Sequence, residues 1–509
     1  MKRYALMFCF MLIIFSLCSG NGYCLDVSLR GQVSSLFIMH DKDGFENGFM
    51  DNLYGSQWRN TLQFDLTLRP EYEGGVPSVY MEKVFLSYRG SYDAIFELTD
   101  RYDNIVEKEQ GDFEIGKDDV EWENDLREVF TDLIAEGGAQ KVNLRLGRQI
   151  VRWGETDSFN VVNVVNPSDR SYQMAFSNPD DLAIPLWMGR MDYSIAGLGF
   201  FDTLGFQFLA IPDIRPTQFA PLNGRDGFAT FDAPYGFLLS AFDGYGITYF
   251  HQDVPDNTFE NMEYAMSTTF TIGSLQGALH YFVGHQHDPA IDWAQYLTYF
   301  APMYPPYNLP PGSFGGAPEI TFRHPRQRTY GYSWNYFMQW ANAVVRGEGA
   351  LTDKAHLMDM EFTDPTDLDG ISKRTVTQNM LGFDKDLHPT WIGTTSALGL
   401  GIEGYWRHVK DWYTDPDLHG FDKRDTFVVT CLMYTDYWNY KIRPMILAMY
   451  DTEGCWMTNA SIKYDPDGKW LFTLAQSSFW GNENGISNFS YGGALINTSE
   501  LSFKVTYRF

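Results

Sequence analysis

Charged side chains of both signs gather in one short segment of the chain. Three arginines lie in a strand-like stretch, and acidic residues follow in the connection after it. An acidic loop facing a basic wall creates a transverse field, which in a narrow, low-dielectric passage orders water and sorts solutes by charge and dipole. The candidate residues for such a constriction are Arg145, Arg148, Arg152, Trp153, Glu155, Asp157, Asp169 and Arg170, with Asp180 and Asp181 available for pairing.

The same residues also allow a purely structural interpretation. Because buried charges need partners before anything else, Arg148 and Glu155 could pair to hold the loop while Trp153 packs as an anchor. The pattern favours this pinning over direct solute contact, and both roles could hold together. A further stretch, Trp58 to Leu68, alternates apolar with polar residues, and its polar face predicts a lumen wall. That wall would carry Arg59, Gln63 and Asp65.

Signatures of common enzyme chemistry are absent from the sequence. It contains no G-x-S-x-G, H-E-x-x-H, P-loop or dinucleotide fingerprint. His285, His287 and Asp288 could suggest a metal site or acid–base chemistry, but they stand where a strand runs into a long loop. We therefore expect no catalytic residue, no metal and no cofactor. A barrel hydrolase that lacks these motifs stays open as an alternative.

The beginning of the chain predicts export. Residues 1–24 start with two basic residues, continue with an apolar run and end in small residues, which is the order of a signal peptide. The run is shorter than the ~20 residues that a membrane-spanning helix needs, and no later stretch supplies such a run. A lipoprotein signal at Cys18 or Cys24 is disfavoured because Leu17 and Tyr23 are large.

Composition and charge favour a β-barrel. Aromatic residues make up 17% of the chain, while hydrophobic residues reach only 44%. A barrel meets lipid with every second residue and collects aromatics at its rims. A soluble all-β secreted protein is the alternative on composition alone. The net charge of −27 argues against nucleic acid as a partner. Part of it lies at residues 107–125, expected as a solvated loop or, alternatively, a site for divalent cations beside lipopolysaccharide.

Alternating strands recur along residues 25–509, which we expect to form one domain. They predict a single antiparallel transmembrane barrel of about 18 strands, with 16 to 20 plausible, short turns on one side and long extracellular loops on the other. The loop at 155–185 is expected to fold into the lumen, and the proline-rich connection 287–327 to lack regular pairing. The candidate strands are 27–39, 58–68, 79–89, 126–135, 142–152, 186–197, 262–270, 275–280, 328–340, 343–352, 397–409, 426–435, 440–450, 455–464, 469–480 and 501–509.

Several motifs resemble a family of poorly characterised proteobacterial outer-membrane proteins. A G-R-Q-x-x-x-W-G-E segment ends at Glu155 and is followed by an N-P-x-D turn. The remaining matches are Asn166, Pro167 and Asp169 for the turn, Pro212, Asp213, Arg215 and Pro216 for a P-D-x-R-P segment, and Arg346, Gly347 and Glu348. The resemblance implies a porin-like barrel in the outer membrane of a Gram-negative bacterium. It also suggests hydrophobic cargo and an inner-membrane exporter as a partner.

The C-terminal segment adds a partner. Residues 501–509 alternate apolar and polar side chains and end in Phe509, which resembles the strand that the outer-membrane assembly machinery recognises. Lipids and lipopolysaccharide would surround the barrel. We therefore expect a channel for small organic solutes, hydrophobic ones included, with the 155–185 loop as constriction. The alternative is a barrel with a closed lumen that acts in surface binding or in envelope or exporter assembly.

Overall fold

The computed structural model describes most of the chain after the predicted signal peptide. The described residues are 24–41, 53–72, 78–100, 120–159, 161–169, 171, 179–218, 249–300, 310–313, 315, 319–358, 371–389, 391, 393, 396–411, 424–452, 454–481 and 499–509. Of the predicted signal peptide, only Cys24 lies among them. Arg170 and residues 107–119 of the acidic stretch lie outside the described residues.

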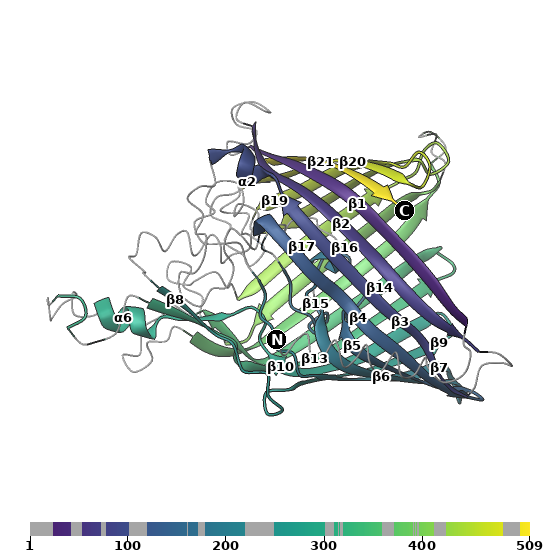
Figure 1. Ribbon diagram of the computed structural model, residues 1–509, viewed down its shortest axis with the longest axis horizontal. Helices are drawn as coiled ribbons and strands as arrows, with labels where there is room; N and C mark the ends of the chain where they lie inside the picture. Colours follow the sequence, from purple (N-terminus) through teal and green to yellow (C-terminus); the bar gives the residue numbers. More distant parts are fainter. Residues whose placement is uncertain are drawn as a thin grey trace.

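Eighteen antiparallel strands form one closed barrel (Figure 1). Each strand pairs with the next barrel strand in the chain, and the last strand pairs with the first. The strands are β1 (Cys24–Asp41), β2 (Leu53–Glu71), β3 (Val79–Asp93), β4 (Trp122–Gly137), β5 (Gln140–Gln149), β6 (Leu186–Leu198), β7 (Phe201–Ile211), β9 (Glu263–Ile272), β10 (Leu275–His285), β13 (Arg326–Met338), β14 (Ala343–Met358), β15 (Ile371–Leu387), β16 (Leu398–Val409), β17 (Asp425–Tyr434), β18 (Ile442–Asp451), β19 (Cys455–Tyr464), β20 (Trp470–Gly481) and β21 (Ser499–Arg508).

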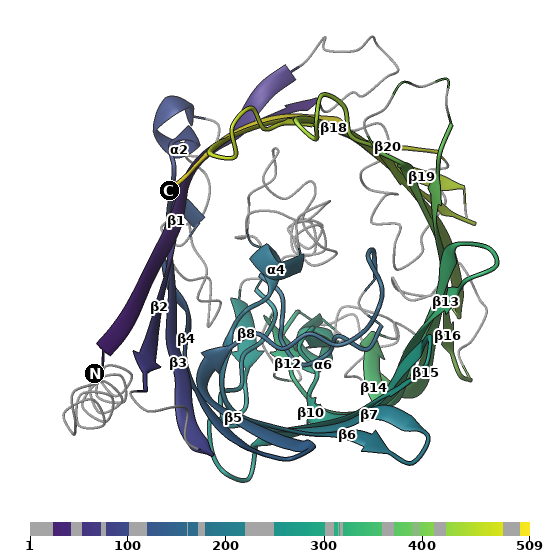
Figure 2. The same ribbon diagram turned by 90° about the vertical axis from the view of Figure 1, so that its right-hand side faces the viewer.

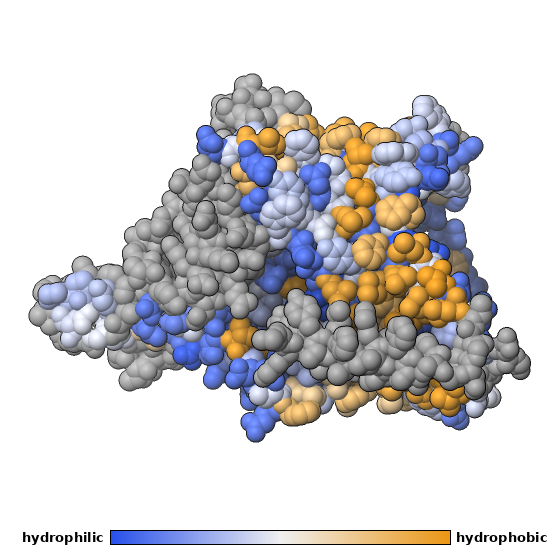
Figure 3. All heavy atoms as spheres, in the orientation of Figure 1, coloured by the Kyte–Doolittle hydropathy of each residue, from blue (hydrophilic) through white to orange (hydrophobic). Residues whose placement is uncertain are grey.

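The register of β1 against β2 separates an apolar outer face from a polar inner one. On the outer face the facing pairs are Val27–Leu68, Leu29–Leu66, Val33–Leu62 and Phe37–Trp58. On the inner face they are Arg30–Asp65, Gln32–Gln63 and Ser34–Thr61. Leu62 is 42% exposed although it is apolar. Figure 3 shows apolar residues gathered over this wall. Such a surface is stable against lipid and not against water, so the closed barrel spans a membrane.

The C-terminal residue completes the seam of the barrel. The Phe509 N–H donates to the Gly31 carbonyl at 2.9 Å, and the Gly31 N–H donates to the Phe509 carbonyl at the same distance. The aromatic ring covers Gly31 closely, because a Cβ added there would lie 2.5 Å from its Cζ atom. Any larger side chain at position 31 would therefore require the Phe509 ring to move.

Two strands of the barrel were not among the sequence-predicted candidates. They are β7 and β15, and with them the barrel reaches its 18 strands. In β7 the inward-facing Leu209 and Ile211 are fully buried, so both faces are apolar at the end of this strand, whereas Thr203 and Gln207 make the rest of its inner face polar. The alternation that marks a strand in the sequence is lost when lumen contents cover its inner face.

The proline-rich connection contains regular structure, contrary to our expectation for residues 287–327. A three-stranded sheet combines β11 (Ala290–Asp292) and β12 (Glu319–Arg323) of this connection with β8 (Tyr249–Asp253) of the preceding one. The sheet pairs backbone stretches that carry no proline, so the prolines limit its length without preventing it. Helix α6 (Ala294–Phe300) packs near β12, beyond the end of the barrel (Figure 1). The other short helices are α2 (Ile95–Leu98) and α4 (Pro179–Leu182).

Two further observations concern export and the membrane. Cys431 and Cys455 are free thiols, on strands β17 and β19 that are separated by β18. In the described part of the chain, no helix is long and apolar enough to cross a membrane.

The two faces of β2 give a test of the wall. Leu62→Arg should lower the free energy of unfolding by about 2–4 kcal/mol, because the cation would face the hydrocarbon layer. The neighbouring Gln63→Arg places the same charge at the same depth on the lumen side and should change stability much less. Urea unfolding of the refolded protein in lipid vesicles measures both. Equal losses for the two variants would contradict the assignment of the faces.

Candidate functional site

The connection between β5 and β6 is tied together at its base by one asparagine. Asn166 accepts a hydrogen bond from the Val151 N–H at 2.8 Å and donates to the Ile184 carbonyl at 2.9 Å. The Gln149 side chain donates to the Met188 carbonyl at 3.3 Å. These contacts join the two ends of the segment 150–185, which we call the lumen loop. Gln149 of the G-R-Q-x-x-x-W-G-E segment and Asn166 of the N-P-x-D turn thus fix the point at which the lumen loop leaves the barrel wall.

The lumen loop crosses to the far wall, where one carboxylate holds its backbone. Glu348 on β14 accepts the Glu155 N–H at 2.6 Å and the Val162 N–H at 2.7 Å. Its side chain is almost completely buried. Gly154 has a φ of +98°, and a Cβ there would lie 2.5 Å from the Glu348 carboxylate. The approach of backbone to carboxylate therefore requires glycine at this position.

An arginine beside Glu348 holds the acidic side of the loop. Arg346 forms ion pairs with Asp157, with Asp384 at 2.8 Å and with Glu403 at 3.1 Å, and it also donates to the Glu155 carbonyl. Glu403 on β16 in turn accepts the Asp157 N–H at 3.0 Å. The loop is thus fixed on β14, β15 and β16 by a network in which one buried arginine, Arg346, contacts three carboxylates, of which Glu403 is buried.

Apolar packing fills the space between the lumen loop and the wall. The Trp153 indole stacks on His280 with 4.9 Å between ring centroids and donates to Gln207 at 2.8 Å, while Phe159 stacks on Tyr405 at 4.5 Å. The buried cluster comprises Val151, Trp153, Phe159, Val161, Val162 and Val165 of the loop and Leu186, Met188, Leu209, Ile211, Ala265, Phe282, Ala350, Met380, Tyr405, Val428 and Met449 of the strands. A barrel interior thereby acquires a core of its own.

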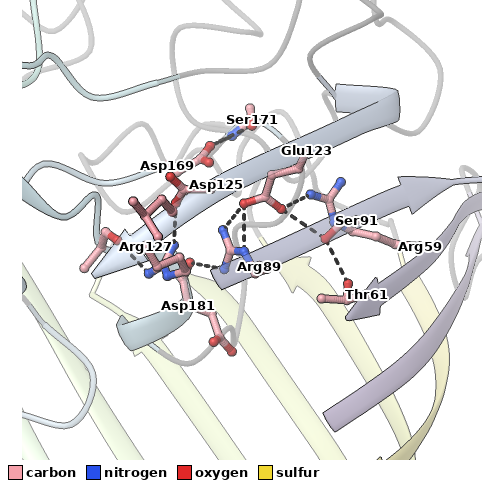
Figure 4. Close-up of polar contacts among 12 residues, drawn as sticks. Arg59, Thr61, Arg89, Ser91, Glu123, Asp125, Arg127, Asp169, Ser171 and Asp181 are labelled. Atoms are coloured by element: carbon pink, nitrogen blue, oxygen red, sulfur yellow. Dashed lines mark hydrogen bonds and ion pairs between the residues drawn. The ribbon is translucent and has the colours of Figure 1, made fainter. Parts of the chain in front are cut away.

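A second polar cluster lies on β2, β3 and β4 (Figure 4). Glu123 bridges Arg59 at 2.6 Å and Arg89 at 2.5 Å, and the Ser91 hydroxyl donates to it at 3.1 Å. Beside it, Asp125 pairs with Arg148 at 2.8 Å. This arginine-rich wall faces the part of the lumen loop that contains α4, which lies inside the ring of strands in Figure 2.

Backbone carbonyls of the lumen loop complete the arginine-rich wall. Arg89 donates to the Asp181 carbonyl at 3.1 Å and Arg127 to the Ala183 carbonyl at 2.9 Å. Nearby, burial raises the pKa of Asp169 although the Ser171 N–H and hydroxyl donate to its carboxylate at 3.0 and 2.6 Å. The loop therefore contacts two walls, one through carboxylates of β14 and β16 and one through arginines of β3 and β4.

The structure distributes the sequence-predicted residues over several places. Arg148 pairs with Asp125 and not with Glu155, whose backbone is held by Glu348 instead. Arg145 pairs with Asp132 at 2.7 Å on the neighbouring strand, and Arg152 is exposed. Gln63 and Asp65 occupy the inner face of β2, as does Arg59. Arg170 lies outside the described residues.

Residues that sequence reasoning gave no role are central to the site. Arg346 and Glu348 belong to a motif that the resemblance had singled out, yet nothing in the sequence showed what they bind. Arg89 and Glu123 had no signal beyond alternation on their strands. Their partners are more than 30 residues away or on the far side of the barrel. Only the closed barrel brings them together.

His285, His287 and Asp288, near the end of β10, are the residues for which the sequence suggested a metal site. Among the residues that the structure describes, no group of three or more His, Cys, Asp or Glu is placed to hold a metal ion. His285 contacts Glu263 through its ring at 3.2 Å. Burial lowers the pKa of His324 to about 4 and also lowers the pKa of His287, so both rings are neutral at pH 7.

One family model covers almost the whole described barrel. The family described as "Protein of unknown function (DUF1302)" matches residues 42–509. The chain belongs to this family. That description agrees with the resemblance to a poorly characterised family, while the G-R-Q-x-x-x-W-G-E motif as its signature stays a prediction. None of the curated proteins matches the sequence.

Solved barrels from two bacteria are similar along most of their length. OccAB3 from Acinetobacter baumannii has 8% identity and a TM-score of 0.46, with 95% of this chain and 99% of that chain covered. The vanillate complex of OpdK from Pseudomonas aeruginosa has 9% identity and a TM-score of 0.45, with 95% and 98% covered. Because both TM-scores are below 0.5, the fold assignment rests on the closed sheet itself.

Removal of the central carboxylate tests how the lumen loop is held. Glu348→Ala should speed hydrogen exchange in residues 154–162 about tenfold or more, because hydrogen bonds to a charged acceptor contribute about 1.5–3 kcal/mol each. Hydrogen exchange with mass spectrometry measures this segment. Glu260→Ala, in an exposed loop, is the control and should leave it unchanged. Unchanged exchange in Glu348→Ala would show that the carboxylate does not hold the loop.

Proposed function

We propose that the protein is a porin-like channel of the Gram-negative outer membrane that passes small organic solutes. The observation that carries the proposal is the lumen loop, which is fixed across the barrel interior by Glu348 and Arg346. A loop that is held on β14–β16 and on β3–β4 narrows the lumen. It does so without a separate domain that would plug the barrel. Because the loop is packed directly on β14–β16, the constriction is formed between the opposite side of the lumen loop and the wall across from β14–β16.

The chemistry of the lumen supports organic solutes, hydrophobic ones included. On one side Val164, Leu447 and Met457, at the margin of the buried cluster, keep part of their apolar surface exposed. On the other side stand the paired arginines and carboxylates of β2–β4. An apolar surface beside fixed charges sorts solutes by shape, polarity and charge. We assign no catalytic residue to this surface.

The apolar cluster also favours a second candidate, a barrel whose lumen is closed. Seventeen residues of the loop and strands are buried as they would be in a soluble core. A barrel closed in this way would serve surface binding or envelope assembly. Conductance separates the two candidates, because a closed barrel carries no current.

Assembly of the barrel is proposed to depend on its terminal strand. Phe509 is 54% exposed at the end of β21, where the outer face alternates apolar residues, and the outer-membrane assembly machinery would contact it. Membrane lipids and lipopolysaccharide are the expected surroundings of the outer face. An inner-membrane exporter as a partner stays a prediction that the described contacts do not address.

Deletion of the lumen loop tests the channel. Removing residues 155–185 leaves β5 and β6 joined by residues 150–154, which suits their direct pairing at Gln149 and Leu186. In planar bilayers, single-channel conductance should rise several-fold relative to the intact protein, because the constriction sets the resistance. Deletion of α6, which lies beyond the barrel end, is the control and should leave conductance unchanged (Figure 1). If neither the intact nor the deleted barrel conducts while both fold, the closed-lumen candidate replaces the channel.

A further inference from the structure

Basic side chains form a row on the inner face of the barrel from β18 to β2. Arg443 on β18 faces Lys463 on β19, and Lys463 faces Thr473 on β20. Thr473 in turn faces Lys504 on β21. The row continues through Leu36 on β1 to Arg59 on β2. Four of the six positions in this row are cationic, and we call it the basic row.

The register also shows that the basic row points into the lumen. The residues next to it in sequence belong to the outer face, where Ile462, Leu474 and Phe503 are 51%, 48% and 47% exposed. Ile462 faces Leu474, and Leu474 faces Phe503, so these three form the matching apolar row outside. Because side chains alternate along a strand, Lys463 and Lys504 lie on the opposite side.

The two lysines of the basic row have no acidic partner in the described part of the chain. Arg443 forms a bidentate pair with Asp436 at 2.8 and 2.9 Å, and Arg59 pairs with Glu123. In contrast, the side chains of Lys463 and Lys504 make no ion pair or hydrogen bond within those residues. Their positive charges are therefore not neutralised by a neighbouring carboxylate and contribute a positive potential to the lumen.

The basic row is expected to lower the stability of the barrel, so stability does not explain why these residues are cationic. Like charges that face each other directly on neighbouring strands are destabilising, and Arg443 and Lys463 do so. The inner-face positions next to the basic row are uncharged within the strands, and Asp465, just past the end of β19, is paired with Arg508 at 3.1 Å. The uncharged positions are Met445, Ser461, Ala475, Ser502 and Ile38 on one side and Leu471, Thr506, Ser34 and Thr61 on the other. Glu500, four residues from Lys504 on the same face, is ~13 Å away along the strand.

The basic row rises through the lumen as a spiral. Lys463 is one residue from the short-turn end of β19, whereas Arg59 is twelve residues from that end of β2. Strands lie ~4.8 Å apart, so Lys463, Lys504 and Arg59 are spaced by ~10 Å. With strand tilts of about 40°, each such step climbs ~6 Å along the barrel axis. The row thus leads from the short-turn mouth toward the arginine-rich wall.

We propose that the basic row makes the lumen selective for small organic anions, such as carboxylates, and hands them from the short-turn mouth to the arginine-rich wall or in the reverse direction. This inference rests on the proposed channel function and names its solute class. It opposes the net charge of −27, which by itself would favour cations. A fixed charge ~10 Å away in water changes the local anion concentration by about twofold.

Two measurements in the full-length refolded protein test the basic row. The reversal potential in a KCl gradient should show that chloride permeates better than potassium in the wild type. The variant Lys463→Gln/Lys504→Gln should lower the chloride-to-potassium permeability ratio by about twofold or more. In proteoliposomes, benzoate should enter faster than the neutral benzamide, and the double variant should lose this advantage. Unchanged preferences in a conducting double variant would overturn the inference.

A matched control removes the same number of charges elsewhere. Lys410→Gln/Lys469→Gln changes one external connection and one short turn, and it should keep the anion preference of the wild type. If it loses the preference equally, net charge and not the basic row sets selectivity, and the inference fails. Conductance without any anion preference in the wild type rejects the basic row but leaves the channel intact. Absence of conductance in folded protein rejects the proposed channel instead.

Discussion

The shape of the lumen depends on one interaction. The Glu348 carboxylate accepts hydrogen bonds from backbone N–H groups of the lumen loop. A loop that enters a barrel exposes backbone donors, and these must find acceptors once packing excludes water. Glu348 supplies two acceptor positions at one point, and Gly154 lets the backbone approach it. Together with the contacts of Arg346 and Glu403, the Glu348 contact fixes the position of the apolar side of the loop against β14–β16. The constriction, the packed cluster and the remaining lumen all follow from that position.

The closed sheet imposes the second constraint, which concerns both faces of every strand. Lipid accepts no unpaired backbone, so the sheet must close, and β21 closes it against β1 with Phe509 over Gly31. Apolar side chains are then required outside, while the inside is free to vary. This freedom lets one sector hold an apolar core and another hold Arg59, Arg89 and Glu123. The function of such a barrel therefore depends on the rows of side chains on its inner face.

Inner rows run across strands and so combine residues that are distant in the sequence. The basic row joins Arg443, Lys463 and Lys504 with Arg59, which stands 384 to 445 residues earlier in the sequence. The contact that fixes the lumen loop also joins distant residues, because the Glu155 N–H donates to Glu348, which is 193 positions later in the sequence. Strand register creates these neighbours, and a shift by one residue would turn every one of them to the lipid side.

The sequence by itself determined the barrel class, the lumen loop and much of the wall. Alternation with period two is a local property, so it is visible wherever one face meets lipid and the other water, as at Trp58 to Leu68. It failed at β7, whose inner face is covered by the loop, and it could not show the small sheet of β8, β11 and β12. Only the tertiary structure decided that Arg148 binds Asp125, that Glu348 holds the loop and that the lysines form a row. Closure and register set these contacts, and both depend on all strands at once.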